Sequence, residues 1–338
     1  MSRYNLNSNL CYPHPMNIIV DGRYQIIKRL GKGGFAHTYL AKNLTAPGEP
    51  QCVVKQLRPK VEHPRMLQLF KLEAAILDRF RHSQIPQKVD CFEHQGDFFM
   101  VQDFFAGDDL SKEFTIGHQW SEAKVVRFLR EMLKVLSYVH QKQAIHRDIK
   151  PANIIRRWDN GQLCLIDFGA VQDLDSDSLD PQTIVGTPGY HAPEQAKGVA
   201  TFGSDIYALG MTAIQFLTGH YPLHLPKNAS KEVVWRDLAT VSDRLATILE
   251  QMTRVDRVDR YDCTLAVLAD LETLPCGSEE QQPMCAHRLL DAESNRQQLT
   301  GKMMAAVILG LGLVSSGAIV SQIQSPQSTV GGESLVER

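Results

Sequence analysis

The chain has 338 residues, a hydrophobic share of 43%, a charged share of 22% and a formal net charge of −2. These values are typical of an ordinary globular protein that is long enough for two lobes and a tail. The near-neutral charge and the absence of a dense Lys/Arg run argue against nucleic-acid binding, which needs a basic surface to displace counterions from phosphates. The 7 cysteines are scattered and form no C-x-x-C pair. They favour reduced thiols in a cytoplasmic compartment over a disulfide framework or a zinc site.

The first part of the chain reads as an irregular lead followed by strands. Residues 1–22 are polar, contain Pro13 and Pro15, and include no apolar run of signal-peptide length. A strand-like stretch over 23–30 leads into the glycine-rich sequence 31–40, whose backbone N–H groups can approach phosphate oxygens closely. That pattern is a weak signal by itself, because an ordinary glycine-rich hairpin is an equally good interpretation.

Two elements that follow carry isolated charges. Residues 52–55 form an apolar strand ending in Lys55, and a buried lysine is costly unless a carboxylate or a phosphate meets it. Residues 67–80 show the apolar spacing of a helix, with Glu73 beside the apolar face. By itself, such a glutamate is usually a solvated surface residue. Residues 97–105 then read as a buried strand.

Helices are expected to dominate the second half of the chain. Ser121 caps a long amphipathic helix that runs to His140, whose apolar face serves as scaffold. Residues 204–217 form an almost wholly apolar helix, which belongs at the centre of a lobe. A last helix is expected over 264–271.

The stretch His146–Gly169 gathers side chains that suit phosphoryl transfer, in which a protein mainly positions the nucleophile and neutralises phosphate charge. Asp148 can accept the proton of an attacking hydroxyl, and Lys150 supplies a positive charge beside the phosphate. Asn153 and Asp167 offer oxygen atoms to a hard cation such as Mg²⁺.

A polar passage over 170–189 follows, with several aspartates and hydroxyls, and it suits a mobile segment. Its end runs into Gly186–Glu194, which reads Gly-Thr-Pro-Gly-Tyr-His-Ala-Pro-Glu. No general structural rule requires these two elements, G-T-P-G-Y and A-P-E, at this distance after Asp-Phe-Gly. The combination is therefore a strong functional signal.

Taken together, the motifs resemble those of the eukaryotic-type (Hanks) Ser/Thr protein kinases, bacterial membrane-anchored branch. The resemblance covers 23–274 and implies an α+β, two-lobed protein kinase fold. A small β-rich N-lobe with one helix (23–102), a hinge (103–106) and a larger helical C-lobe (107–274) are expected. The resemblance also implies ATP and Mg²⁺ as cofactors, and a Ser or Thr hydroxyl of a protein substrate as the acceptor.

The resemblance assigns roles to individual residues. Asp148 is the expected catalytic base, with Lys150 and Lys55 holding phosphate charge. Glu73 becomes the expected ion-pair partner of Lys55, and this pairing would be the on/off geometry of the enzyme. Asn153 and Asp167 are the expected Mg²⁺ ligands. The expected nucleotide-binding residues are Gly31, Lys32, Gly33, Gly34, Phe35, Ala36, Thr38, Val53, Lys55, Gln102, Asp103, Phe105 and Asn153.

Some of these positions depart from the family pattern. Ala36 stands where the third glycine of the loop is expected, Thr38 where a valine is expected, and Val53 where an alanine is expected. Ala36 stiffens the loop without removing its phosphate contacts, and Val53 narrows the roof of the adenine pocket. Lys150 and Thr187, in contrast, match the Ser/Thr rather than the Tyr branch.

Further residues are expected to hold the site in shape. Arg260 would pair with Glu194. Asp205 would accept hydrogen bonds from the catalytic loop, His146–Asn153, and a plain helix-capping role is the alternative. Arg147 would bind a phosphate in the activation segment, the polar passage over 170–189 together with its end at Gly186–Glu194, on Thr183 or, less favourably, on Ser176 or Ser178. Ordinary loop hydroxyls are an equally good interpretation of the last three residues.

The tail predicts a membrane anchor. Residues 275–301 read as a juxtamembrane linker, and 302–320 contain 18 uncharged residues, the lower limit for a transmembrane helix. A buried core helix is the alternative. Basic residues lie on the kinase side of this segment, namely Arg288, Arg296 and Lys302, which favours a single-pass protein of the cell membrane with a cytoplasmic kinase domain. Residues 321–338 would form a short non-cytoplasmic tail. The small-x-x-x-small spacing of Ala306 and Gly310 is compatible with a homodimer.

Two other functions remain open at this stage. A pseudokinase or nucleotide-binding scaffold would normally have lost Lys55, Asp148 or Asp167, and this chain retains all of them. A kinase for small molecules uses catalytic Asp and Asn residues in the same way as a protein kinase, but it generally lacks the elements found within Gly186–Glu194.

Overall fold

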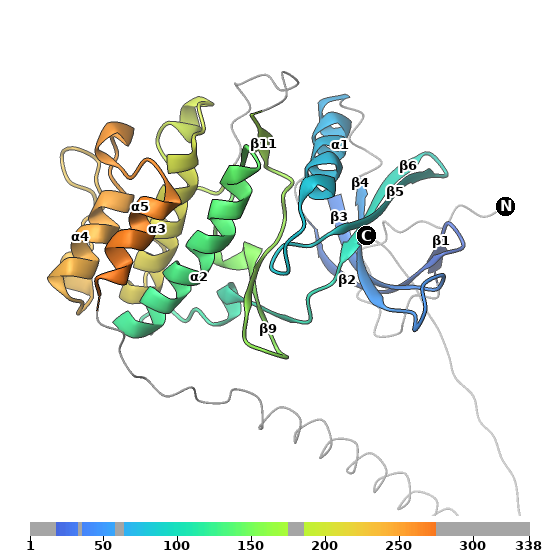
Figure 1. Cartoon of the computed structure of the whole chain (residues 1–338), viewed down its shortest axis with the longest axis horizontal. Helices are drawn as coiled ribbons and strands as arrows, with labels where there is room; N and C mark the ends of the chain where they lie inside the picture. The colour runs from blue at the N-terminus through green and yellow to red at the C-terminus, as the bar shows by residue number, and fades with distance from the viewer. Residues whose placement is uncertain (1–17, 33–35, 58–63, 175–185, 275–338) are drawn as a thin grey trace, which may run out of the picture. The chain divides into compact units, whose positions relative to one another are not determined.

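The computed structural model describes residues 18–32, 36–57, 64–174 and 186–274. The N-terminal part is a 6-stranded antiparallel sheet with the order β1-β2-β3-β4-β6-β5, and one helix, α1, lies beside it (Figure 1). Its elements are β1 (Ile18–Val20), β2 (Tyr24–Lys32), β3 (Ala36–Asn43), β4 (Gln51–Leu57), α1 (Pro64–Arg79), β5 (Lys88–His94) and β6 (Asp97–Asp103).

The two faces of this sheet have separate apolar cores. On β4, Cys52 and Val54 belong to a cluster with Tyr24, Tyr39 and Phe99 on the outer face of the sheet. Because side chains alternate along a strand, Val53, Lys55 and Leu57 point to the opposite face, where Leu57 packs with α1 in the main core. This alternation directs the lysine of an otherwise apolar strand toward the helix.

The C-terminal part is mainly helical and lies on the other side of the hinge region (Figure 1). Its helices are α2 (Glu122–Gln141), α3 (Phe202–Thr218), α4 (Asp243–Met252) and α5 (Thr264–Glu272). Its short strands are β7 (Gly107–Asp109), β8 (Ala144–Ile145), β9 (Ile154–Arg157), β10 (Leu163–Leu165) and β11 (Gln172–Asp173). Single 3₁₀ turns complete it: η1 (Leu110–Lys112), η2 (Pro151–Asn153), η3 (Gln195–Lys197), η4 (Pro222–His224), η5 (Arg236–Leu238) and η6 (Arg257–Asp259).

Helix α3 is the centre of this helical lobe. Nearly every residue along it is buried, including the polar Thr212 and Gln215, as its continuous apolar sequence predicts. Thr201 and Ser204 form a capping box that starts the helix, and Gly219 ends it with a left-handed φ of 69°. At Gly210 a Cβ atom would lie 2.8 Å from the Thr253 side chain, so the missing side chain lets the C-terminal end of α4 approach.

The observed elements differ from the expected ones mainly at their ends. The helix expected over 67–80 is α1, which begins earlier at Pro64, and proline is well suited to the first helical position. The strand expected over 97–105 ends at Asp103, because Asp103 makes the last pairing with Cys52 of β4 and the chain then leaves the sheet. The two-lobed α+β arrangement agrees with the expected fold.

The expected transmembrane segment, 302–320, lies outside the described residues, as do Thr183 and the first 17 residues of the expected irregular lead, 1–22. The end of that lead is not irregular, because Ile18–Val20 form β1 and pair with β2. Within the described ranges, no helix combines the length and apolar character needed to cross a bilayer. The cysteines that the structure describes, Cys52, Cys91, Cys164 and Cys263, are free thiols.

A buried ion pair joins the end of the activation segment to the last helices. The Arg260 side chain is fully buried, and its Nη1 donates to Glu194 Oε1 at 2.7 Å and to the Gly203 carbonyl at 3.0 Å. Ser204 Oγ donates to the same Glu194 oxygen at 2.7 Å. Burial opposes the charge of Glu194, but the hydrogen bonds from Arg260 and Ser204 hold the pKa of this carboxyl below its usual range.

Replacing Arg260 by Ala should destabilise the domain by about 3 to 5 kcal/mol, because Glu194 would keep a largely buried charge without its cation. In the native chain, the lowered pKa of Glu194 means that its stabilisation is complete above the ordinary carboxyl range of about pH 4.3 and is lost as the pH falls through the folded pKa. Urea unfolding of native and variant protein, followed from pH 7 down to about pH 3, measures both effects. A variant that unfolds at the native urea midpoint at pH 7 would contradict this account.

Candidate active site

The loop after β8 is shaped by one buried carboxylate. Asp205, in the first turn of α3, accepts hydrogen bonds from the backbone N–H groups of His146 and Arg147, both at 2.9 Å. His140 Nε2 lies 2.9 Å from the same carboxylate. Burial opposes the charge of Asp205, but the His140 contact and these amides hold its pKa below the usual range. Arg147 has a left-handed φ of 66°, so the loop backbone keeps a costly conformation that Asp205 stabilises.

Asp148 follows directly and lies at the centre of a set of hydrogen-bond donors. Its Oδ2 accepts from Lys150 Nζ at 2.7 Å and from Asn153 Nδ2 at 2.9 Å. Its Oδ1 accepts from the hydroxyl of Thr187 at 2.7 Å, and Lys150 Nζ also donates to that hydroxyl at 2.7 Å. The loop therefore presents a carboxylate, oriented by a lysine and an amide, to a hydroxyl group.

Asp167 lies beside this loop, because the backbone N–H of Ile166 donates to the Asn153 carbonyl at 2.9 Å. Asp167 also has a left-handed φ of 66°, and 51% of its side chain is exposed. Its Oδ1 accepts from Lys55 Nζ at 2.8 Å, and this positive charge lowers the pKa of Asp167 to about 2. The carboxylate is therefore ionised and open to solvent on one side.

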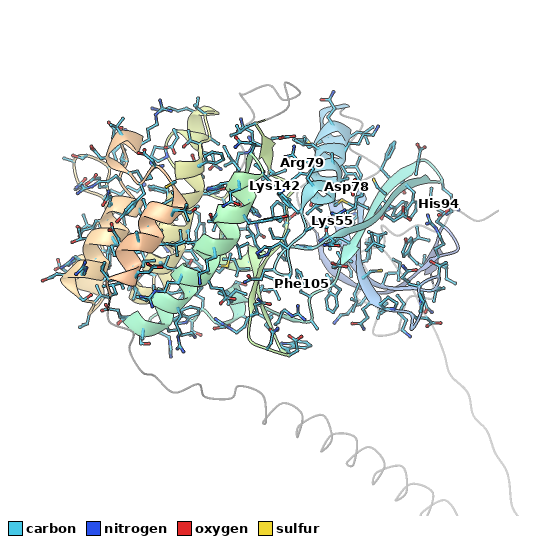
Figure 2. All side chains as sticks on the ribbon, in the orientation of Figure 1. Lys55, Asp78, Arg79, His94, Phe105 and Lys142 are labelled. Atoms are coloured by element: carbon cyan, nitrogen blue, oxygen red, sulfur yellow. The ribbon has the colours of Figure 1, made fainter. Side chains whose placement is uncertain are left out.

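Lys55 makes the connection between the two lobes. Its Nζ donates to Glu73 of α1 as well as to Asp167, and both Lys55 and Glu73 are buried. Burial opposes the charge of Lys55, but the carboxylates of Asp167 and Glu73 outweigh it and raise the pKa of the lysine. Figure 2 labels Lys55 between α1 and the sheet.

Phe168 fixes the residue that follows Asp167. Its buried ring lies 4.7 Å from the ring of His146 and 5.2 Å from that of Phe80, both in edge-to-face geometry. These contacts pack the segment between the catalytic loop and the end of α1. They keep the Asp167 side chain directed toward Lys55.

Several of the expected nucleotide-binding residues lie on β2 and β3, the strands that precede the Lys55 strand β4 in the sheet. Gly31 and Lys32 end β2, and Ala36 opens β3. Thr38 pairs with Gly31 on one side and with Lys55 on the other. The remaining loop residues, Gly33, Gly34 and Phe35, lie outside the described residues.

Strands β4 and β6 carry more of the expected nucleotide-binding residues. Val53 pairs with Gln102, which is buried. The side-chain oxygen of Gln102 has no hydrogen-bond partner among the described residues. Asp103 is exposed, and Phe105 lies under the guanidinium of Arg157 at 5.7 Å. An unpartnered buried acceptor directly before the expected hinge, 103–106, fits a ligand that brings a donor, as the amino group of adenine does.

The donor atoms near Asp167 fit Mg²⁺. Asn153 uses its Nδ2 to donate to the Asp148 carbonyl at 2.8 Å and to the Asp148 carboxylate, which leaves the amide oxygen for a cation. Together with Asp167 this offers a carboxylate and an amide oxygen. Mg²⁺ commonly takes one or two such protein ligands and fills the other positions with water and phosphate oxygens.

A family model described as "Protein kinase domain" matches residues 24–270. The chain belongs to the protein kinase family. It is 38% identical over 281 residues to Serine/threonine-protein kinase B of Synechocystis sp., which covers 79% of this chain and 49% of that protein. It is 39% identical over 271 residues to Serine/threonine-protein kinase PknA of Nostoc sp., covering 76% of this chain and 48% of that protein. The chain therefore spans about half the length of these curated relatives.

A more distant relative is Serine/threonine-protein kinase PrkC of Bacillus subtilis, with 28% identity over 268 residues, or 75% of this chain and 41% of that protein. Lys55, Glu73, Asp148, Asn153 and Asp167 all lie within the matched residues.

Arg147 of this kinase domain was expected to bind a phosphate, but its guanidinium group already donates hydrogen bonds within the structure. It is buried, and it donates to the carbonyls of Ala170 at 2.5 Å and Val171 at 3.3 Å. Burial lowers its pKa to about 10, with Asp205 opposing that effect. In the described structure Arg147 therefore holds the start of the activation segment, and its partnership with Thr183 stays a prediction.

One interaction of this kinase domain was not expected from the sequence. Arg79, at the end of α1, donates from Nη1 and Nη2 to both oxygens of Asp173, at 3.1 and 3.0 Å, and its Nη2 also donates to the Lys142 carbonyl at 3.0 Å. Figure 2 labels Arg79 and Lys142 next to one another, between α1 and α2. Asp173 is one of several aspartates in 170–189, and nothing in the sequence distinguishes it. This contact links the helix that carries Glu73 directly to the activation segment.

We expect Arg79→Ala to lower phosphoryl-transfer activity several-fold, because α1 loses a bidentate link that helps to keep Glu73 at Lys55. Asp173→Ala should have a similar effect, and the double variant should be little worse than either single one, with a coupling free energy of about 1 kcal/mol. Hydrogen exchange of the α1 amides, measured together with turnover, checks the mechanism. The control is Arg236→Ala, which removes an exposed ion pair with Asp243 far from α1. Additive effects of the two changes, with unaltered exchange in α1, would contradict the coupling.

Proposed function

We propose that the chain is an ATP- and Mg²⁺-dependent Ser/Thr protein kinase that transfers the γ-phosphoryl group of ATP to Ser or Thr hydroxyls of proteins, including its own. The observation that carries this proposal is the hydrogen bond between a Thr hydroxyl and Asp148 Oδ1, with Lys150 contacting both groups. The names of the relatives, all Ser/Thr protein kinases, support the same function.

Each residue of the site has a separate task in this mechanism. Asp148 accepts the proton of the attacking hydroxyl, in the position that the Thr187 hydroxyl takes in the structure. Lys150, which reaches both groups, neutralises charge as the phosphoryl group moves. Lys55, held by Glu73, neutralises phosphate charge from the opposite side. When bound by Asp167 and Asn153, Mg²⁺ would shield the phosphates.

The same observations weigh against the other two functions. A scaffold without turnover has no need for the geometry of Asp148, Lys150 and Asn153, which orients a base toward a hydroxyl. A kinase for small molecules has no need for the segment that brings Thr187 to that base. Transfer of phosphate to a generic protein substrate, compared with ATP hydrolysis alone, separates the three functions.

Replacing Asp148 by Ala should lower the rate of phosphoryl transfer by about 10² to 10⁴, because the hydroxyl loses its proton acceptor and Lys150 loses its partner. Radiolabelled ATP with a generic protein substrate measures the rate, and mapping of the labelled residues tests autophosphorylation, with Thr183 as the expected site. The matched control is Asp159→Ala, which removes an exposed aspartate from the hairpin after β9. Equal labelling by the Asp148 variant and the native protein would remove this residue from the mechanism.

We also propose that residues 302–320 anchor the kinase in the cell membrane as a single helix, with the kinase domain in the cytoplasm. The support is the uncharged run with basic residues on its kinase side. A bilayer of about 30 Å needs roughly 20 such residues.

Fractionation of expressing cells tests the anchor. The full chain should sediment with membranes and resist extraction at high salt, whereas a chain ending at residue 301 should remain in the supernatant, because the apolar segment supplies the membrane affinity. Recovery of both proteins in the supernatant would refute the anchor without affecting the kinase proposal. Crosslinking of the membrane fraction tests whether the anchored chains form homodimers.

A further inference from the structure

A groove of about 380 Å³ begins beside the catalytic base. Lys150 and Thr187, which both contact Asp148, form its inner end. Its walls come from η1 and the nearby Phe114, from the catalytic loop, from the end of the activation segment, from α3, and from η4. The lining residues are Ser111, Phe114, Lys150, Pro151, Ala152, Thr187, Pro188, Tyr190, Gln215, Tyr221, Pro222, Leu223 and His224.

The walls of this groove are held in place by specific contacts. The rings of Phe114 and Tyr221 meet edge-to-face at 4.8 Å. Tyr190 Oη donates to Gln215 Oε1 at 2.6 Å, which ties the activation segment to α3. At Gly189, with a φ of +92°, a Cβ atom would lie 2.9 Å from the Leu223 backbone nitrogen. The groove is therefore a built surface and not a gap between mobile loops.

The chemistry of the lining is apolar. Aromatic, proline and leucine side chains predominate, and among the described residues none that lines the groove carries a carboxylate. The charged member is Lys150. A basic side chain entering here would meet no carboxylate in the lining, and Asp148 beside the groove is already paired with Lys150 at 2.7 Å. An apolar side chain, in contrast, would be buried against rings.

The rim of the groove is also apolar. Leu223 is 63% exposed and Tyr221 is 43% exposed, so both remain uncovered in the described structure. Exposed apolar residues that gather beside a catalytic group indicate a binding surface more than isolated ones do. One lysine side chain separates the groove from the base, so the occupant belongs to the same molecule as the hydroxyl that Asp148 receives.

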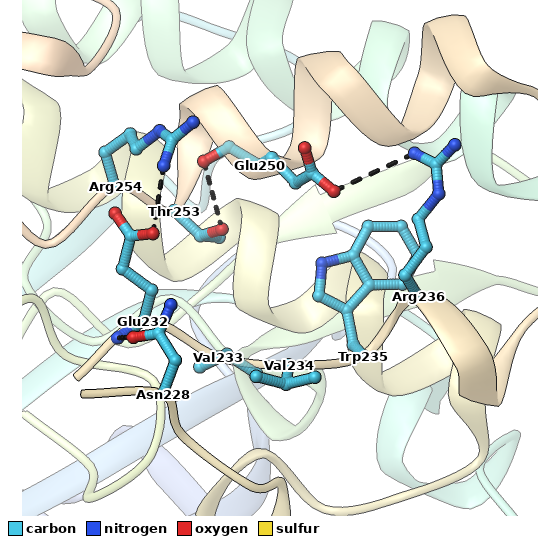
Figure 3. A pocket seen from close by; sticks show the side chains of 9 residues that line it. All are labelled: Asn228, Glu232, Val233, Val234, Trp235, Arg236, Glu250, Thr253 and Arg254. Atoms are coloured by element: carbon cyan, nitrogen blue, oxygen red, sulfur yellow. Dashed lines mark hydrogen bonds and ion pairs between the residues drawn. The ribbon is translucent and has the colours of Figure 1, made fainter. Parts of the chain in front are cut away.

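A second hollow of about 230 Å³ gives a useful contrast (Figure 3). It is lined by residues around η5 and the end of α4, and both of its arginines face carboxylates: Arg254 lies 2.9 Å from Glu232, and Arg236 lies 3.8 Å from Glu250. No catalytic residue lines it. Its charges are paired and it has no connection to the base, so it does not compete with the groove for the substrate.

We propose that the groove selects protein substrates in which an apolar or aromatic side chain lies close to the acceptor Ser or Thr, and that it disfavours those with a basic side chain there. This inference rests on the proposed kinase function and names its substrate class. The occupant is the substrate segment that flanks the acceptor hydroxyl. Leu223 at the rim and the Phe114–Tyr221 pair in the wall make the contact.

Peptide substrates with a fixed Ser or Thr and one varied flanking position test this proposal with the full-length protein. At the position that enters the groove, Leu or Phe should give a kcat/KM roughly tenfold higher than Arg. Leu223→Glu should shift this ratio toward Arg by roughly tenfold, and Leu223→Lys should shift preference toward Glu or Asp instead. The matched control, Leu265→Glu, places the same charge at a residue of α5 that is 60% exposed and does not line the groove. It should leave the preference unchanged.

The outcomes separate the two proposals. Equal kcat/KM for all flanking residues, or a native preference that Leu223→Glu does not alter, would overturn the groove assignment and leave the kinase function intact. A Leu223→Glu variant that changes the sedimentation of the protein but not its peptide preference would assign the surface to a contact between copies, and would also overturn it. Failure to label any peptide or protein would reject the kinase function and the groove assignment together.

Discussion

The site depends on one positive charge held between two carboxylates. Lys55 comes from β4, an inner strand of the sheet, Glu73 from α1, and Asp167 from the segment after β10 of the helical lobe. The lysine is buried, so its charge is tolerated only while these carboxylates face it. An apolar strand can carry the lysine because the side chains on either side of it point to the opposite face of the sheet. Movement of either lobe therefore acts on the charge that meets the phosphates.

A second constraint keeps the catalytic loop in a conformation that it would not adopt alone. Arg147 and Asp167 both have left-handed φ values, which are rare for residues with side chains. The carboxylate of Asp205 stabilises the first by accepting two backbone N–H groups, and the packing of Phe168 between His146 and Phe80 stabilises the second. Strain of this kind persists where the surroundings over-determine the backbone. Here its result is that Asp148 and Asp167 point into the same space.

The activation segment is attached at both of its described ends. At its start, Asp173 binds Arg79 of α1, and the carbonyls of Ala170 and Val171 accept from Arg147. At its end, Thr187 reaches Asp148, and Glu194 is held by Arg260. The segment thus contacts the helix that positions Lys55, the base that receives the hydroxyl, and the groove that we assign to the substrate. A change in this one segment reaches all three parts of the proposed reaction.

The sequence by itself determined the family and most of the candidate site. Two short motifs contain Asp148, Lys150, Asn153 and Asp167. Chance would rarely place these two motifs and the other kinase motifs of the chain in the order that the family has. The predicted ends of helices and strands were less accurate. The end of α1 or β6 depends on where strand pairing and packing stop and not on local sequence preference. Only the tertiary structure decided that Arg79 meets Asp173, 94 residues away, and that Phe114, Leu223 and Pro188 line one groove. Apolar periodicity predicts which face of an element is buried, but contacts between distant segments depend on how the packed elements are oriented toward one another.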